Sequence, residues 1–250
     1  MYELSLSFFL SFLYNINGDI MKLLASDYDL TFYKDDTSFN KNIEVLRGFK
    51  KNNLFVIVTG RSYLDYINVS KNKVDCNYLV VNHGATIIKD NMVIKSNSIN
   101  KDTIRKLKKI FNFDSLKYFA TSNLESRVDI NHDEISKINI ELENIVEAKK
   151  AVKYIDNHFD DIKAYQLMIH KNHVEIVSKF ADKKNAIEYI AEIENIDNND
   201  IYTVGDGYTD IEMIKSFHGY AIENSVDEIK KSSESIVDNV SDLMKKIMNY

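Results

Sequence analysis

The chain has 250 residues, with 44% hydrophobic and 28% charged side chains, an ordinary composition for a globular protein that buries a sizeable core. Its formal net charge of −6 argues against general binding to nucleic acid, which requires a basic face. The single cysteine, Cys76, excludes an intrachain disulfide framework and fits a reducing cytoplasm, which is the location that we predict.

Residues 1–20 differ in composition from the rest of the chain. The stretch LSLSFFLSFLY is too short to span a bilayer as a helix, and no Lys or Arg precedes Lys22, as a secretory signal would require. We therefore predict a protein without a membrane partner, whose native start is Met21 and whose residues 1–20 are not native. A genuine but dispensable segment is the second interpretation, and a signal anchor is the third.

From residue 21 to residue 84, short apolar runs alternate with helical patterns, which is typical of parallel βαβ units. The strand patterns are at 22–29, 54–60 and 78–85, and the helical patterns are at 40–53 and 62–72. The alternation returns after residue 180, with a helix at 183–193, a strand at 201–206, a helix from Asp210, a strand at 220–224 and a last helix. These parts predict a doubly wound, parallel-sheet (Rossmann-like) core of the α/β class, formed by residues 21–84 and 181–250.

The pattern changes between these two parts, and residues 85–180 predict an inserted α+β domain. We expect a hairpin at 86–96, an amphipathic helix at 101–111, a strand at 124–130, mostly helix over 135–159, and two strands joined by a tight turn within 163–179.

Polar residues stand at the carboxyl ends of predicted strands or at the start of a predicted helix, where ligands bind in open α/β sheets. The four motifs are DYDLT at 27–31, VIVTGR at 56–61, ADKKNAI at 181–187 and VGDGYTD at 204–210. Each motif alone is a weak signal, because acidic pairs, Thr-Gly strand ends, surface lysines and glycine-flanked aspartates also occur in plain turns. Their conjunction is much stronger, although Lys183 and Lys184 compete for the third position.

In this order, with a long insertion between the second and third, the motifs resemble those of the haloacid dehalogenase (HAD) superfamily. More narrowly they resemble its Cof-type sugar-phosphate phosphatases (type IIB), whose large α/β cap domain is inserted at that place. The resemblance covers residues 21–250, and the segments VNHGA and AIENS are also similar to family segments. About 30 residues separate Asp29 from Thr59, too few for a cap after the first motif.

The resemblance implies a Mg²⁺-dependent phosphatase that hydrolyses a small phosphorylated metabolite, in particular a sugar phosphate, through an aspartyl-phosphate. It makes Asp27 the nucleophile and Asp29 the group that protonates the leaving alcohol and then deprotonates water. It places Mg²⁺ on Asp27, Asp206 and the backbone carbonyl of Asp29, with Asp210 in a supporting position. The family strand order, 3-2-1-4-5, would bring Asp27 and Asp206 together at the switch point.

The resemblance also implies which groups hold the phosphoryl oxygens, namely Thr59, the Gly60 amide and Lys183. Arg61 follows this turn and is a further candidate for contact with the substrate. Thr209 replaces the asparagine that usually precedes the second aspartate of the last motif, and its hydroxyl is still able to donate a hydrogen bond to phosphate.

Other interpretations stay open. A phosphosugar mutase or phosphotransferase would pass the phosphoryl group to a sugar in place of water. A catalytically silent phospholigand-binding protein would explain Thr209 and Leu30, which stands where the family usually has glycine. A phosphoaspartate receiver is disfavoured by the long insertion. For His83 we favour a polar loop role. The sequence leaves the metabolite open, and it leaves open whether the chain is a monomer or a homodimer.

Overall fold

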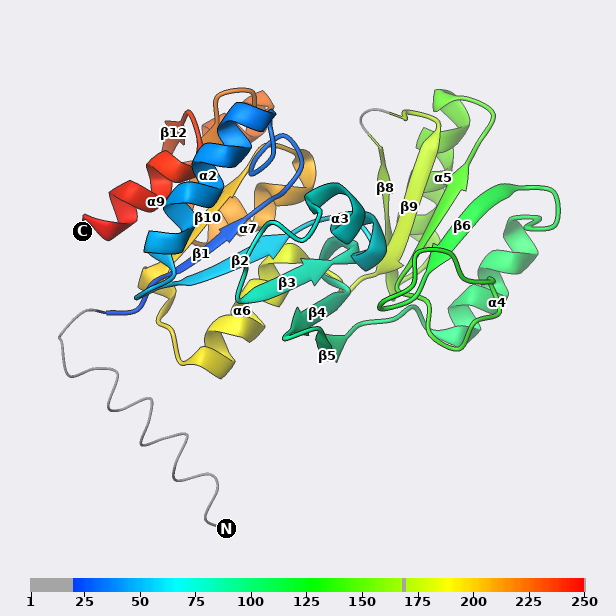
Figure 1. Ribbon diagram of the computed structural model, residues 1–250. Helices are drawn as coiled ribbons and strands as arrows, with labels where there is room; N and C mark the ends of the chain where they lie inside the picture. Colours follow the sequence, from blue (N-terminus) through cyan, green and yellow to red (C-terminus); the bar gives the residue numbers. More distant parts are fainter. Residues whose placement is uncertain (1–19, 168–169, 250) are drawn as a thin grey trace, which may run out of the picture.

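The computed structural model describes residues 20–167 and 170–249 (Figure 1). The prediction about the native start therefore falls almost entirely on residues outside this range. Within the range, no helix has both the length and the apolar character that crossing a membrane would require.

Among the described residues, the larger of two sheets has eight strands in the order β12-β11-β10-β1-β2-β3-β4-β5. The parallel strands are β1 (Leu23–Ser26), β2 (Leu54–Val58), β3 (Tyr78–Val81), β10 (Ile201–Gly205), β11 (His218–Ile222) and β12 (Ser235–Val237). When these parallel strands are numbered by their order in the chain, the first five lie across the sheet in the order 3-2-1-4-5, and the short strand β12 lies beside the fifth. The doubly wound α/β sheet that the sequence predicts is thereby confirmed.

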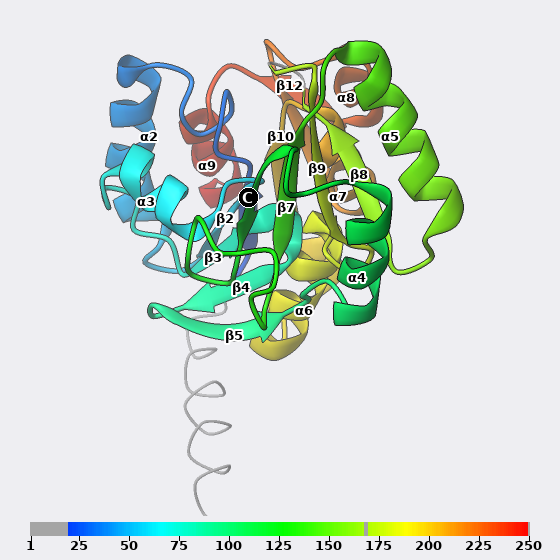
Figure 2. The same cartoon turned by 90° about the vertical axis from the view of Figure 1, so that its right-hand side faces the viewer.

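Helices cover both faces of this sheet (Figure 2). One face carries α2 (Asp36–Phe49), α3 (Tyr63–Ser70) and α9 (Val240–Met248), and the other carries α6 (Lys183–Glu194), α7 (Ile211–Ser216) and α8 (Asp227–Ser232). The side chains of β1 alternate between the two layers, with Leu24 in the first and Leu23 and Ala25 in the second. Because β1 is buried on both faces, polar groups find space only at its ends.

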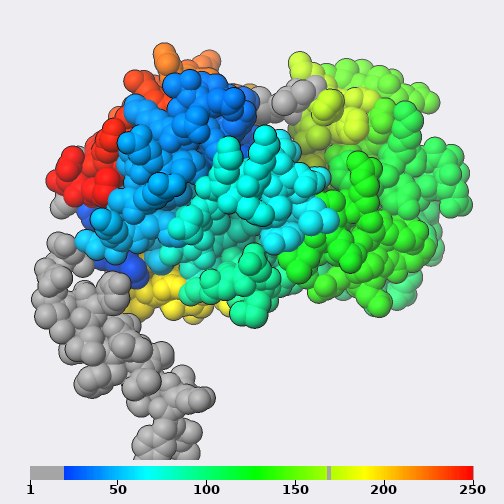
Figure 3. Space-filling view, viewed as in Figure 1, coloured from blue at the N-terminus to red at the C-terminus, as the bar shows by residue number. Residues whose placement is uncertain are grey.

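A second sheet, four-stranded and antiparallel, stands beside the first in the order β6-β7-β9-β8. Its strands are β6 (Lys117–Thr121), β7 (Lys137–Glu141), β8 (Ile162–Gln166) and β9 (His173–Ser178). The helices α4 (Lys101–Ile110) and α5 (Ile145–His158) cover one face and bury an apolar core of their own. We call residues 98–179 the smaller unit and the rest the larger unit. Figure 3 shows the two units in contact.

The smaller unit departs from the sequence-based expectation at two strands. The expected strand at 124–130 is wrong, because that segment contributes an isolated bridge from Val128 to Ala120 and the strand is β6 instead. The expected helix over 135–159 begins only at Ile145, since residues 137–141 form β7. The stretch KINIE alternates polar and β-branched residues, which is the period of a strand with two different faces.

The hairpin at 86–96 forms as predicted, from β4 (Thr86–Lys89) and β5 (Met92–Ser96). It pairs with β3, with Ile87 opposite Val80, and so extends the larger sheet instead of joining the second one. The chain therefore enters the smaller unit, as defined above, only at residue 98, after β5 has ended at Ser96. The division into domains at 85 and 180 remains a prediction.

The two connections between the units run side by side. The Asn97 N–H donates to the Ala85 carbonyl (2.7 Å), and the Asn97 side-chain amide donates to the Phe180 carbonyl (3.3 Å). Beside them Gly84 lies against the backbone of Asp182, so closely that a Cβ at Gly84 would come within 2.4 Å of the Asp182 carbonyl oxygen. With a φ of 98° as well, this position requires glycine.

Candidate active site

The site begins at the turn that follows β1. The Phe32 N–H donates to the Asp27 carbonyl (3.2 Å) and the Tyr33 N–H donates to the Tyr28 carbonyl (2.8 Å), so the chain folds back directly after the strand. Tyr28 and Phe32 are buried in the core of the larger unit and anchor this turn. As a result Asp27 is only 8% exposed, whereas the side chain of Asp29 reaches solvent.

Leu30 occupies this turn with a φ of 60°, in the left-handed region. A residue with a Cβ pays roughly 1–2 kcal/mol for this conformation, and glycine does not. The backbone therefore gives a physical reason for glycine at this position in proteins with the same motif. The turn itself is formed with leucine in place.

We predict that Leu30→Gly raises the free energy of unfolding by about 1 kcal/mol, measured by urea denaturation. The relief of left-handed strain exceeds the entropy that glycine adds to the unfolded chain, and little packing is lost because Leu30 is 49% exposed. Leu64→Gly, at a similarly exposed leucine in helix α3, is the control and should lower stability. A lower stability in Leu30→Gly would contradict the prediction.

Three carboxylates meet at the ends of two adjacent strands. β1 and β10 pair with Ser26 opposite Val204, and the Asp27 N–H donates to the Val204 carbonyl (2.9 Å). Asp27, Asp206 and Asp210 each offer an oxygen atom, and these atoms lie within 4.8 Å of one another. The fold thus brings the first and the last motif together.

Lys183 closes this cluster from the first turn of α6. Its Nζ lies 2.6 Å from Asp27 Oδ1 and 2.6 Å from Asp210 Oδ1, and its side chain is 3% exposed. Lys184 instead forms an ion pair with Glu188 along the helix surface. The structure therefore places the first lysine of the KK pair at the site and the second one outside it.

Asp210 shapes the loop after β10. Its Oδ2 accepts the N–H groups of Asp206 (3.1 Å) and Gly207 (3.0 Å), so both of its oxygens are engaged within the protein. Gly205 is required for this close approach, since a Cβ there would come within 2.6 Å of the Asp210 side chain. Across the site, the Thr31 hydroxyl donates to Asp206 Oδ1 (2.7 Å).

The negative charge of this cluster exceeds the positive charge that Lys183 brings, and the pKa values reflect the imbalance. Burial, Asp210 and Asp206 raise the pKa of Asp27 well above its ordinary value, against the attraction of Lys183. Burial raises the pKa of Asp206 to about 6 in spite of the hydrogen bond from Thr31. Burial opposes the charge of Lys183, but Asp210 and Asp27 outweigh it and raise the lysine pKa. The site would therefore be stabilised by further positive charge.

The donor set fits a divalent cation. Carboxylate oxygens are the ligands that Mg²⁺ prefers, and the spacing of the three acids suits a shared ion. Because Asp210 already serves Lys183 and two backbone amides, Asp27 and Asp206 are the acids with oxygen atoms to spare. Asp210 would then support the ion indirectly. The contribution of the Asp29 carbonyl stays a prediction.

The second motif forms a turn at the end of β2. The Arg61 N–H donates to Thr59 Oγ1 (3.1 Å), which fixes the buried threonine hydroxyl. The Arg61 side chain forms a bidentate ion pair with Asp29, with Nε 2.8 Å from Oδ2 and Nη2 2.7 Å from Oδ1. Thr209 is half-buried in the short helix Tyr208–Asp210. The roles of Thr59, Gly60, Arg61 and Thr209 toward phosphate stay predictions.

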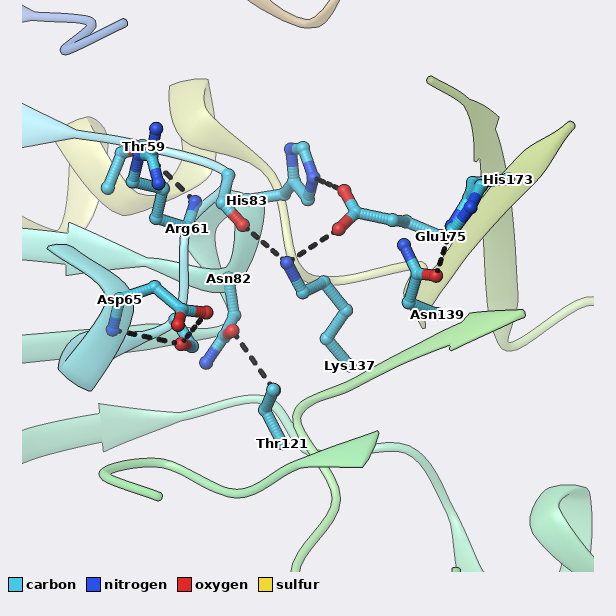
Figure 4. A network of polar contacts seen from close by, with 12 residues as sticks. Thr59, Arg61, Asp65, Asn82, His83, Thr121, Lys137, Asn139, His173 and Glu175 are labelled. Carbon is cyan, nitrogen blue, oxygen red and sulfur yellow. Dashed lines mark hydrogen bonds and ion pairs between the residues drawn. The ribbon is translucent and has the colours of Figure 1, made fainter. Parts of the chain in front are cut away.

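Sequence reasoning missed two charged residues beside this turn. Lys137 on β7 and Glu175 on β9 are buried at the contact between the units, next to Gly60 (Figure 4). His83, for which a polar loop role was expected, is also buried there and contacts Glu175. For Lys137 the signal is the alternation of polar and β-branched residues in KINIE, which the helical interpretation of residues 135–159 obscured.

The fold and this cluster define a Rossmann-like protein with acidic groups and one lysine gathered at the switch point of its sheet. A family comparison matches residues 24–127 and 108–243 to the haloacid dehalogenase-like hydrolases. The chain belongs to this family. Its placement among the Cof-type members stays a prediction.

Known relatives agree with this assignment. A solved HAD/COF-like hydrolase from Plasmodium vivax superposes on 94% of this chain and 98% of its own, with a TM-score of 0.76 and 20% identity. A phosphoglycolate phosphatase from Sulfurisphaera tokodaii is 24% identical over 91% of this chain and 94% of its own length. A 5-amino-6-(5-phospho-D-ribitylamino)uracil phosphatase from Bacillus subtilis is 30% identical over 94 residues, which cover 37% of this chain and 31% of that protein.

Proposed function

We propose that the protein is a Mg²⁺-dependent phosphatase that hydrolyses a small phosphorylated metabolite, in particular a sugar phosphate, through an aspartyl-phosphate. The observation that carries this proposal is the cluster of Asp27, Asp206 and Asp210 closed by Lys183 at the ends of adjacent strands. Burying ionised groups costs several kcal/mol per ion unless they are well paired, so a purely structural role would be an expensive one.

In this proposal Asp27 attacks phosphorus, and a carboxylate O–P bond forms as the bond to the leaving alcohol breaks. Water then cleaves the acyl phosphate, which releases inorganic phosphate and restores the carboxylate. Lys183, in contact with Asp27, neutralises charge on the phosphoryl oxygens together with Thr59 and the Gly60 amide. Mg²⁺ held by Asp27 and Asp206 would supply further positive charge to the same oxygens.

Asp29 is the group that moves the proton. In its protonated form it gives a proton to the leaving alcohol, and the carboxylate that results takes a proton from the attacking water in the second step. Its side chain is 45% exposed, which would let a leaving alcohol reach it. Arg61 orients the carboxylate through two atoms, which reduces the number of positions that it samples.

Release of inorganic phosphate from a metabolite panel tests the proposal. The panel contains phosphoglycolate, hexose phosphates and pentitol phosphates, each assayed with Mg²⁺ and with excess chelator. We expect release only with the metal. Release that is unaffected by the chelator, or no release from any ester, would contradict the proposal. Added sugar acceptors distinguish the alternative, because a phosphotransferase would form a new sugar phosphate in preference to free phosphate.

Mg²⁺ is expected to raise the melting temperature more at about pH 7.5 than at about pH 5. In the folded protein without metal, the pKa of Asp206 is raised to about 6. The stability that its bound proton contributes is therefore fully present below the unfolded pKa and is lost as pH rises through 6. Near pH 5 the ion must displace that proton, whereas near pH 7.5 the carboxylate is free to bind it. Thermal denaturation with and without Mg²⁺ measures the difference, and Asp206→Asn should reduce the shift at both pH values. An equal shift at the two pH values would contradict the prediction.

A further inference from the structure

Three ionisable side chains form a buried chain between the two units. Glu175 Oε1 lies 2.7 Å from Lys137 Nζ, and Glu175 Oε2 lies 2.6 Å from His83 Nε2. Each side chain is at most 8% exposed. Burial opposes ionisation of Glu175, but Lys137 and His83 outweigh it and lower the glutamate pKa, and burial lowers the pKa of His83. The arrangement is therefore a buried Lys–Glu ion pair whose second carboxylate oxygen contacts the His83 imidazole.

The ion pair stands on the face of the second sheet that points away from its own helices. On β7 and β9 the residues Ile138, Ile140 and Ile176 face the apolar core under α4 and α5. Lys137 and Glu175 alternate with them and are diagonal neighbours on the opposite face, which the larger unit covers. Apolar residues would pack such an interface at lower cost, so the pair itself is poorly explained by stability.

This group of buried ionisable side chains contacts Gly60, in the turn to which we assign phosphate binding. Lys137 Nζ donates to the Gly60 carbonyl at 2.7 Å. The His83 ring lies against the same residue from another side, since a Cβ at Gly60 would come within 2.4 Å of its Cε1 atom. Gly60 is thus fixed by a side chain of the smaller unit and by an imidazole that the smaller unit also holds (Figure 4).

The Gly60 carbonyl and the Arg61 N–H belong to the same planar peptide, which links this carbonyl to the rest of the site. In a trans peptide the C=O and the following N–H point in opposite directions, so fixing the Gly60 carbonyl also fixes the direction of the Arg61 N–H. That N–H donates to Thr59 Oγ1, and the Arg61 guanidinium holds Asp29. A single contact from Lys137 therefore bears on the threonine hydroxyl and on the acid of the proposed reaction.

We propose that Lys137 is a positioning residue for this reaction: its contact with the Gly60 carbonyl sets the phosphate-binding turn, and Glu175 and His83 keep the ammonium in place. The inference rests on the proposed function. Backbone hydrogen bonds from Asn82 and His83 already hold this turn within the larger unit, and docking of the smaller unit adds the contact that orients the Gly60 carbonyl.

The test compares Lys137→Met with the double variant Lys137→Met/Glu175→Gln. The single variant leaves Glu175 buried without its cation and should melt at a lower temperature. The double variant removes both charges and should recover most of that loss. We expect its kcat to stay about 10- to 100-fold below that of the unchanged protein, with a smaller change in KM, because the turn is no longer oriented. Lys137→Arg, which keeps a cationic donor, should recover part of the activity.

A kcat in the double variant within about twofold of the unchanged protein would overturn the proposal, because the pair would then be structural only. Hydrogen–deuterium exchange gives a second readout that needs no activity. Peptides spanning residues 59–62 should exchange faster in the double variant, while those spanning β7 should not. Unchanged exchange at 59–62 would also overturn it.

Failure of the proposed function is distinguishable from failure of this inference, because it would be measured in the unchanged protein. There it would appear as no Mg²⁺-dependent phosphate release and no stabilisation by orthovanadate. The exchange experiment would still report on the contact between Lys137 and the turn.

Discussion

Asp27→Asn is expected to lower kcat by about 10³-fold or more in the presence of Mg²⁺, while the melting temperature without metal stays equal or rises. The asparagine oxygen is a poor nucleophile, so no acyl phosphate forms. Stability should not fall, because the substitution removes one of three crowded carboxylates, and burial and repulsion from the other two already raise the pKa of Asp27. Phosphate release and thermal denaturation on the same samples measure both effects.

A loss of activity without a loss of stability makes this result specific. Simple unfolding would lower activity and melting temperature together. Asp160→Asn, at an exposed aspartate between α5 and β8, is the matched control and should leave both unchanged. Retention of activity in Asp27→Asn would refute its assignment as the nucleophile.

Lys183→Met is expected to lower both kcat and stability. The side chain is 3% exposed and bonds Asp27 and Asp210, so its removal leaves two buried carboxylates without their cation. Loss of one partner of a buried ion pair costs about 3–5 kcal/mol of unfolding free energy. Loss of one preorganised donor to the phosphoryl oxygens should lower kcat by about 10²- to 10³-fold.

Lys184→Met is the control for this variant, because Lys184 is the next residue and forms only a helix-surface ion pair with Glu188. Such pairs contribute at most about 1 kcal/mol, so its activity and its unfolding midpoint should remain close to those of the unchanged protein. Chemical denaturation and steady-state kinetics check both variants. Equal losses in the two would contradict the placement of Lys183 inside the site.

The fold of the larger unit was predictable because its central strands are buried by helices on both faces. LLA and LFVIV are continuous apolar runs, as expected for strands buried on both faces, and each is followed closely by a polar motif. Once β1 and β10 are neighbours, Asp27 and Asp206 must lie near one another. The sequence also offered two lysines for one place, and only the start of α6 decides between them.

The smaller unit was less predictable, since its strands have two different faces and its polar face is buried by a partner far away in the sequence. Lys137 and Glu175 look like ordinary solvent-facing residues until the larger unit is docked on them. Their burial depends on contacts with residues 60 and 83, which no local pattern reveals. The hairpin β4–β5 was recognised as an element, but the sheet that it joins depends on β3.

The adjoining connections at Asn97 and Phe180 limit how the two lobes of this molecule are able to part. The two connecting segments meet at this one point, so rocking of one unit against the other would turn about it. Asp182, pressed against Gly84 at the same point, also caps the helix that starts at Lys183. Any such rocking would be transmitted within a single residue to the ammonium that faces Asp27.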